Sequence, residues 1–296
     1  MTTPADTTTK ASGSRALLAD ATTLGGVELT VTDLDRSLRF YTEVIGLVAQ
    51  ERDRERAVLG PGEAPLITLH VDPNARPAGR HAGLYHVALL FPSREELARA
   101  GRRVAERRVP IDGASDHGTH EAIYLPDTDG IGIELAADWP RERWPDLRGA
   151  DLFAHGPAPL DGAALFATVA GEGAAPRAEP GLRIGHVHLH VADLDAATRF
   201  YRDGLGFEVM MRLPSATFVA AGGYHHHVAY NLWRGSGVPP APAEGVVGLR
   251  RWTLVADGPA ELDAMAMRLD AIGAPLRRDG AELLARDPDG IAVALR

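Results

Sequence analysis

An internal repeat constrains the fold of this chain more than any other feature. Residues 24–47 read LGGVELTVTDLDRSLRFYTEVIGL, and residues 184–207 read IGHVHLHVADLDAATRFYRDGLGF. Ten residues between Val27 and Gly46 recur at a constant offset of 160. Such repetition indicates a fold assembled from copies of one structural unit.

Further matches divide each half of the chain into two modules. The segment DTDGIGIEL (127–135) recurs as DPDGIAVAL (287–295), and YHVALLFPSREEL (85–97) is more distantly similar to RRWTLVADGPAEL (250–262). The four modules, of about 50 residues each, lie near 24–74, 83–138, 183–233 and 248–296. The expected organisation is a flexible tail (1–23), a first half (24–138), a linker rich in Pro, Gly and Ala (139–182) and a second half (183–296).

Each module begins with alternating apolar residues, as in Val27, Leu29 and Val31, and this period predicts a half-buried strand. A helix capped by Asp33 or Asp35 is expected to follow. Short strands interrupted by glycine come next, so each module is predicted to be βαβββ. Four such units predict an α+β protein with two curved sheets, each built from two modules.

Composition excludes several classes of function. The chain has no cysteine, so disulfides, thiolate metal sites and cysteine nucleophiles are excluded, and any metal must be held by imidazole and carboxylate. The net charge of −9 argues against nucleic-acid binding, which depends on a basic surface. No apolar run approaches the length of a membrane span, and the first residues lack the hydrophobic block of a signal peptide. We therefore expect a soluble cytoplasmic protein with no nucleic-acid or membrane partner.

Three motifs resemble those of the vicinal oxygen chelate superfamily, which includes glyoxalase I, bleomycin-resistance proteins and extradiol ring-cleaving dioxygenases. They are GHVHLHVADL with RFY and LGF, LYHVALLFPSREEL, and YLPDTDGIGIEL. The resemblance covers nearly the whole chain after residue 23. Through GGYHHH and HEAIYLPDTDG the chain most resembles the bacterial catechol 2,3-dioxygenases. The resemblance implies four βαβββ modules that form two curved, open, eight-stranded barrels.

The resemblance also implies two metal-ligand positions in each module, one on its first strand and one on its last. The first-strand positions carry Gly26, His86, His186 and Arg251, and the last-strand positions carry about His70, then Glu134, the run His225–His227, and Ala294. Strand alternation supports this assignment, because it places His86, His186 and Glu134 opposite the apolar faces of their strands.

The site that these positions form depends on which modules share a sheet. Pairing modules one with two, or three with four, leaves each site incomplete or places Arg251 in it. Pairing two with three joins His86, His186 and Glu134, and two imidazoles with one carboxylate are the ligand set of non-haem Fe(II) oxygenases. We expect this crossed pairing, although adjacent modules pair more commonly in the superfamily. Arg251 is then expected to pair with a carboxylate in a second, degenerate cavity. The alternative for Glu134 is an arginine partner, because a buried carboxylate needs compensation.

Extradiol ring cleavage also needs a general base and later a general acid, and histidine suits both roles. The resemblance places this residue in the histidine run. Strand alternation selects His227 first and His225 second, and points His226 toward the helices.

Five further residues are expected in the pocket or at its rim. Tyr124, ten residues before Glu134 and on the same strand face, occupies the place of a family tyrosine that assists deprotonation of the substrate. His188 and Asn231 are expected on the inner face of their strands, and His117, with its neighbour His120, at the pocket rim.

The sequence therefore predicts an Fe(II)-dependent extradiol dioxygenase of aromatic catabolism, which inserts both atoms of O₂ into catechol or a substituted catechol. Mn(II) and Zn(II) are alternatives for the metal, because His₂Glu binds several divalent ions. The alternative functions are a glyoxalase-like metal-dependent lyase or isomerase, and a metal-free binding protein of the bleomycin-resistance kind. The expected partners are a small aromatic diol and O₂, and a homodimer is expected from the tendency of sheet edges to pair.

Overall fold

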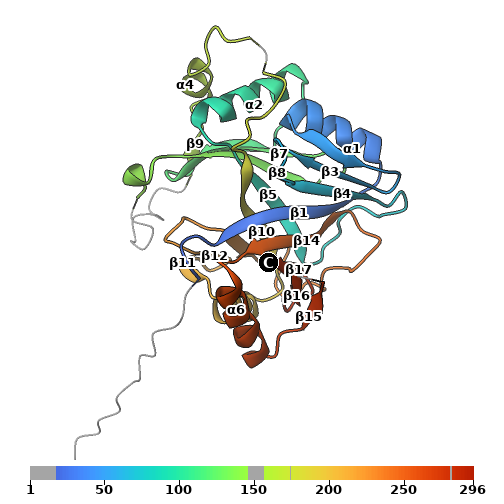
Figure 1. Ribbon diagram of the computed structural model, residues 1–296. Helices are drawn as coiled ribbons and strands as arrows, with labels where there is room; N and C mark the ends of the chain where they lie inside the picture. The colour runs from blue at the N-terminus through green and yellow to red at the C-terminus, as the bar shows by residue number, and fades with distance from the viewer. Residues whose placement is uncertain (1–17, 146–156, 174, 281) are drawn as a thin grey trace, which may run out of the picture.

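The computed structural model describes residues 18–145, 157–173, 175–280 and 282–296, which include the four predicted modules apart from residue 281 (Figure 1). Module one consists of β1 (Thr23–Val31), α1 (Leu34–Phe40), the π-helix η1 (Tyr41–Ile45), β2 (Val48–Arg52), β3 (Arg56–Gly60) and β4 (Ile67–Val71). Module two consists of β5 (Gly83–Leu90), α2 (Arg94–Glu106), β6 (Gly113–Asp116), β7 (His120–Pro126) and β8 (Gly132–Asp138).

The second half repeats this order of elements. Module three consists of β10 (Arg183–His190), α5 (Leu194–Thr198), the π-helix η3 (Arg199–Leu205), β11 (Glu208–Arg212), β12 (Ala216–Ala220) and β13 (Val228–Asn231). Module four consists of β14 (Gly248–Val255), α6 (Pro259–Ala271), β15 (Leu276–Asp279), β16 (Glu282–Arg286) and β17 (Ala292–Leu295). The segment between the halves contains a 3-10 turn η2 (Arg141–Arg143), β9 (Ala158–Pro159) and α4 (Gly162–Ala167).

The modules pair across the two halves of the chain. The first sheet has the strand order β15-β16-β17-β14-β1-β4-β3-β2 and joins modules four and one. The second sheet has the order β11-β12-β13-β10-β5-β8-β7-β6-β9 and joins modules three and two. The structure thus has the crossed arrangement that the count of ligands favoured, and the predicted α+β fold with two mixed, unclosed sheets is confirmed.

The second sheet has nine strands where eight were expected. The ninth, β9, comes from the segment predicted as a linker and pairs with β6, placing Pro159 opposite Ser115 and Ala158 opposite Asp116. A strand of two residues is too short to show the alternation by which longer strands are recognised in a sequence.

The ends of the predicted tail and linker are partly described. Residues 1–17 and 146–156 lie outside the described residues, and the prediction of a flexible tail falls mostly on the first range. Leu18 is buried in the core, and the Ala19 amide and Thr22 hydroxyl donate hydrogen bonds to Glu261 on α6. Chain before β1 therefore packs against module four.

Local sequence explains how each first strand turns into its helix. Asp33 caps α1 by accepting a hydrogen bond from the Arg36 amide, and Asp193 caps α5 in the same way. Both π-helices end at a glycine with positive φ, 92° at Gly46 and 102° at Gly206, which other residues rarely adopt. Among the helices of the described ranges, none is both long and apolar enough to cross a bilayer.

Candidate metal centre and pocket

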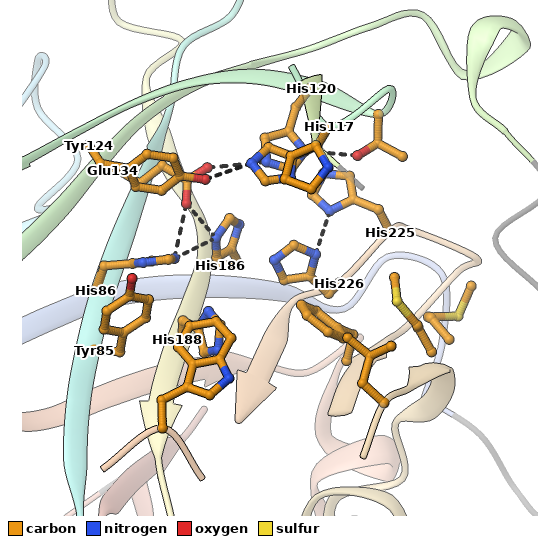
Figure 2. Close-up of a pocket in the computed structure, with 17 residues that line it drawn as sticks. Tyr85, His86, His117, His120, Tyr124, Glu134, His186, His188, His225 and His226 are labelled. Carbon is orange, nitrogen blue, oxygen red and sulfur yellow. Dashed lines mark hydrogen bonds and ion pairs between the residues drawn. The ribbon is translucent and has the colours of Figure 1, made fainter. Parts of the chain in front are cut away.

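The three residues predicted as metal ligands lie on the three central strands of the second sheet. His186 on β10 and Glu134 on β8 both lie opposite Ala88 on the intervening strand β5. His86 lies two residues before Ala88, on the same face of β5. Because Ala88 has only a methyl side chain, it leaves room for longer side chains beside it. Figure 2 shows that His86, His186 and Glu134 converge. Crossed pairing of the modules is what brings this site together.

The ligand atoms of the three residues form a compact triangle. Glu134 Oε2 lies 3.0 Å from His86 Nε2 and 3.1 Å from His186 Nε2, and the two Nε2 atoms lie 3.2 Å apart. Bonds of about 2.1 Å at right angles to one another separate neighbouring ligand atoms by about 3.0 Å. The triangle therefore matches one face of an octahedron, which leaves the opposite face of a metal ion open.

The electrostatics of this triangle suit a divalent cation. Burial raises the pKa of the Glu134 carboxyl, but the charge and hydrogen bonds of the surrounding histidines outweigh burial and hold this pKa well below its usual range. Burial lowers the pKa of His186, so its imidazole is neutral with a lone pair to donate. A buried carboxylate and neutral imidazoles are the forms in which these side chains bind metals.

The ion-pair partners of Glu134 also favour a metal over an arginine. Glu134 is 1% exposed, and among the described residues its partners are His86, His186 and His120. None of these three partners is an arginine, and a divalent ion bound between the carboxylate and the imidazoles would compensate the buried negative charge. The residues present therefore fit a metal with two histidine ligands and one carboxylate ligand.

Tyr124 and His117 both line the pocket and contact each other. The Tyr124 hydroxyl lies 2.7 Å from His117 Nε2, and the Tyr124 ring lies 5.6 Å from the ring of His86. Burial and the charge of Glu134 raise the pKa of Tyr124, while burial lowers the pKa of His117 to about 4. Both groups are therefore neutral near pH 7, and the hydroxyl and the ring nitrogen share a hydrogen bond.

The structure corrects the orientation expected for the histidine run. His225 and His226 line the pocket, whereas His227 lies outside it, where its Nδ1 accepts a hydrogen bond from the Ala221 amide and its ring approaches Phe207. The expectation rested on strand alternation, but β13 begins only at Val228. Residues 225–227 lie in an irregular turn, so their side chains do not alternate.

His225 belongs to a second hydrogen-bonded group next to the triangle. Its Nε2 lies 3.1 Å from Asp138 Oδ1, and the Tyr224 hydroxyl donates to the same carboxylate. The ring of His225 stacks on His120 with centroids 4.6 Å apart. Burial lowers the pKa of His225 to about 3, although the hydrogen bond to Asp138 opposes this shift.

The sequence alone did not identify Asp138 as a site residue and placed His120 only at the pocket rim. Asp138 lies four positions after Glu134 on β8, so strand alternation could have placed both on one face. His120 was expected at the rim, but it is 3% exposed, and its Nε2 lies 3.2 Å from Glu134 Oε1. Each oxygen of the Glu134 carboxylate therefore has its own histidine neighbours.

Of the two residues His188 and Asn231, both expected to line the pocket, only His188 does so. His188 lines the pocket, with its ring 5.0 Å from that of His86. Asn231 is fully buried behind His188, and its amide nitrogen lies 2.9 Å from His188 Nε2. Asn231 thus holds His188 in place and does not itself line the cavity.

The pocket around the triangle has a volume of about 470 Å³. Among the described residues its lining is aromatic and apolar, apart from Thr119 and the groups already discussed. The remaining lining residues are Tyr85, Thr119, Pro157, Met210, Met211, Leu213, Phe218 and Trp233.

The equivalent place on the first sheet holds a network of ion pairs. Glu28, at the position that corresponds to His188, lies 2.6 Å from Arg251 and 2.9 Å from His70. Arg251 also lies 2.8 Å from Glu282. The prediction that Arg251 pairs with a carboxylate is confirmed, and a guanidinium at this position cannot bind a metal.

Comparison with known proteins agrees with the fold and the repeat. The sequence model of the Glyoxalase/Bleomycin resistance protein/Dioxygenase superfamily matches residues 23–135 and 183–295. The chain is 38% identical over 273 residues to the catechol-2,3-dioxygenase of Bacillus subtilis (strain 168), and the match covers 90% of this chain and 94% of that protein.

Solved structures show the same architecture at lower identity. A putative dioxygenase from Bacillus subtilis has a TM-score of 0.62 at 13% identity, over 95% of this chain and 86% of the other. Glyoxalase I from Zea mays has a TM-score of 0.56 at 17% identity, over 93% and 92% of the two chains. On the evidence of the duplicated family match and the relative of nearly full length, the chain belongs to the Glyoxalase/Bleomycin resistance protein/Dioxygenase superfamily.

Proposed function

We propose that this protein is an extradiol dioxygenase, which binds Fe(II) through His86, His186 and Glu134 and cleaves the ring of catechol or a substituted catechol. The triangle of ligand atoms carries the proposal, because its spacing fits three neighbouring ligands and leaves the pocket side of a metal free for substrate and oxygen. The relative of 38% identity is named a catechol-2,3-dioxygenase, which supports the same activity.

The metal, when bound, supplies the redox chemistry by which O₂ reacts with an adjacent pair of hydroxylates. The protein must orient the diol, exclude bulk water and move its protons. The buried histidines and the aromatic lining of the pocket favour a planar, weakly polar ring over water.

Two groups are suited to accept protons from the diol. The Tyr124 oxygen can accept a proton from a substrate hydroxyl while its own proton passes to His117 Nε2, 2.7 Å away. His225 is neutral, and the Asp138 carboxylate at 3.1 Å stabilises the imidazolium that forms when His225 takes a proton. The same imidazolium can return its proton later, so His225 serves as base and then as acid.

The direct test is to purify the protein without oxygen, load it with Fe(II), and add catechol and air while recording the visible spectrum. The proposal predicts about one iron per chain and a yellow ring-opened product. Bound Zn(II) or Mn(II) with no coloured product after iron loading would instead support a lyase or isomerase. A protein that binds no metal under any of these conditions would be a binding protein.

A further inference from the structure

The pocket is much larger than a single-ring diol requires. A water molecule occupies about 30 Å³ of liquid, so 470 Å³ corresponds to about 15 waters. Catechol displaces about four or five waters on the same scale. A monocyclic substrate held at the triangle therefore leaves most of the cavity unfilled, and cavities of this size typically enclose larger ligands.

The walls of the pocket differ in chemistry. The wall near Glu134 is polar and contains the groups proposed to move protons, namely His117, Tyr124 and His225 with the adjacent His120. The opposite wall comes from β11, β12 and the segments that follow β11 and β13. It consists of Met210, Met211, Leu213, Phe218 and Trp233. Figure 2 shows the two sulfur-bearing side chains on the side of the pocket away from Glu134.

A single histidine ring separates the apolar wall from the predicted metal ligands. The His188 ring lies 5.0 Å from His86 on one side and 5.9 Å from Phe218 on the other. The His226 ring likewise lies 4.0 Å from His186 and 5.2 Å from Phe218. A substituent on the ring of a diol bound at the triangle would therefore reach the apolar wall.

Two aromatic side chains at this end are exposed to solvent. Tyr85 is 41% exposed and Trp233 is 52% exposed, and their rings meet edge to face at 5.2 Å. Trp233 also lies 5.1 Å from His188, and both aromatic rings line the pocket. Large apolar side chains gathered beside a cavity are typical of a ligand contact, because a ligand removes their surface from water.

We propose that the natural substrate is an ortho-diol whose ring carries a bulky apolar substituent, about the size of a second aromatic ring. The substituent lies against Phe218, Met210 and Trp233, and the diol lies at His86, His186 and Glu134. This inference rests on the proposed ring-cleavage function for its diol end. The apolar wall can be tested without that function.

The first test compares catechol with phenyl-substituted catechol as substrates of the iron-loaded protein. Contact of a second ring with the wall should raise kcat/KM by about tenfold to 100-fold over catechol. In Phe218→Ala, and in Leu213→Trp, which fills the space, the ratio of the two kcat/KM values should fall about tenfold. Met267→Ala, which alters a 74% exposed methionine on α6, is the matched control and should leave the ratio unchanged. Equal kcat/KM values for both diols, or a ratio that neither pocket variant alters, would overturn the inference.

The second test measures binding of biphenyl, which has no hydroxyls, to the metal-free protein by calorimetry. Saturable binding that Leu213→Trp abolishes and Met267→Ala preserves would support the apolar subsite, whether or not any diol is cleaved. Failure of biphenyl to bind the wild-type protein would overturn it. Cleavage of neither diol by fully iron-loaded protein would instead contradict the proposed function, so the two failures are distinguishable.

Discussion

The carboxylate of Glu134 has two oxygens with different surroundings. Oε2 lies in the triangle with His86 and His186, whereas Oε1 lies 3.2 Å from His120 Nε2. The His120 ring occupies the space beside Oε1 without a hydrogen bond to it, so Glu134 is expected to bind a metal through Oε2 alone. This arrangement preserves open positions on the metal for substrate and oxygen.

Replacing His120 should change how Glu134 binds a metal. In His120→Ala the Oε1 atom loses its neighbour and becomes free to bind the metal as a second ligand atom, which displaces bound water. Water proton relaxation of the Mn(II)-loaded variant should therefore show fewer exchangeable waters than the wild type, while His120→Gln, which keeps a polar side chain beside Oε1, should resemble the wild type. Equal relaxation in all three proteins would contradict this role for His120.

The histidine run provides an internal comparison for proton transfer. His225→Ala should retain the metal and lower kcat by about 10²–10⁴, because the pocket then lacks its base beside Asp138. His227→Ala should alter kcat little, since His227 lies outside the pocket. Metal content and kcat, measured for both variants, show which of the two histidines transfers protons. A large loss of kcat in His227→Ala with little loss in His225→Ala would support the role that the sequence analysis assigned to His227.

The sequence predicted that His86, His186 and Glu134 lie together better than it predicted the positions of the side chains around them. His86, His186 and Glu134 lie within regular strands, where alternation determines which face a side chain occupies. His226 and His227 precede β13, and no periodic rule reports the direction of side chains in a turn. Distances such as that from His120 to Glu134 depend on tertiary packing, and spacing in the sequence does not contain them.

Among the elements, the two π-helices tie the sheets together in a repeated way. The Tyr41 hydroxyl on η1 donates to Asp127 after β7 at 3.0 Å, and Tyr201 on η3 donates to Asp287 after β16 at 2.8 Å. Each bond joins a module of the first sheet to one of the second. The DTDG and DPDG motifs thus serve as anchors between the sheets.

Removing either hydroxyl should destabilise the protein by a similar amount. Tyr41→Phe and Tyr201→Phe each leave a buried aspartate oxygen without its donor, which costs about 1–3 kcal/mol of unfolding free energy. Urea unfolding of both variants measures this loss. Tyr85→Phe, which alters an exposed tyrosine of the pocket mouth, is the control for the hydroxyl itself. An unchanged urea midpoint in both buried variants would show that these bonds do not hold the sheets together.

Elements with a repeated, periodic sequence were predictable, and the others were not. In modules one and three the first strands show alternation, and the helices that follow them begin at a capping aspartate. By contrast, β9 has two residues and α4 has six, and both lie in a Pro- and Gly-rich segment. Their formation depends on contacts with β6 and α2 in the folded protein, as in the pairing of Ala158 with Asp116.

On the scale of the whole molecule, buried histidines link stability to pH. Burial lowers the pKa of His117 and His190 to about 4 and of His225 to about 3. The pKa of each histidine is about 6.5 in the unfolded chain. Between the folded and unfolded pKa values, the folded protein therefore binds fewer protons than the unfolded chain. Asp127 and Asp287 act in the opposite direction, because burial raises their pKa values to about 6 and about 7. The histidines are more numerous, so acid should be destabilising.

The unfolding free energy of the metal-free protein should therefore fall as the pH is lowered from about 6.5 toward 4, by up to about 1.4 kcal/mol per pH unit for each histidine. The two aspartates offset part of this loss. Urea unfolding at a series of pH values between 7.5 and 4.5 measures the slope. A free energy that rises toward acid would mean that the aspartates dominate.

In the proposed function, one metal site is assembled from both halves of the chain, through His86 and Glu134 of module two and His186 of module three. Its most direct test is to measure the metal bound per chain, by anaerobic Fe(II) titration, in wild type, His86→Ala, His186→Ala and the control His227→Ala. About one iron per chain is expected in the wild type and the control, and none in His86→Ala or His186→Ala. Stoichiometric iron in His186→Ala would contradict this arrangement, because the site would then lie within one half of the chain.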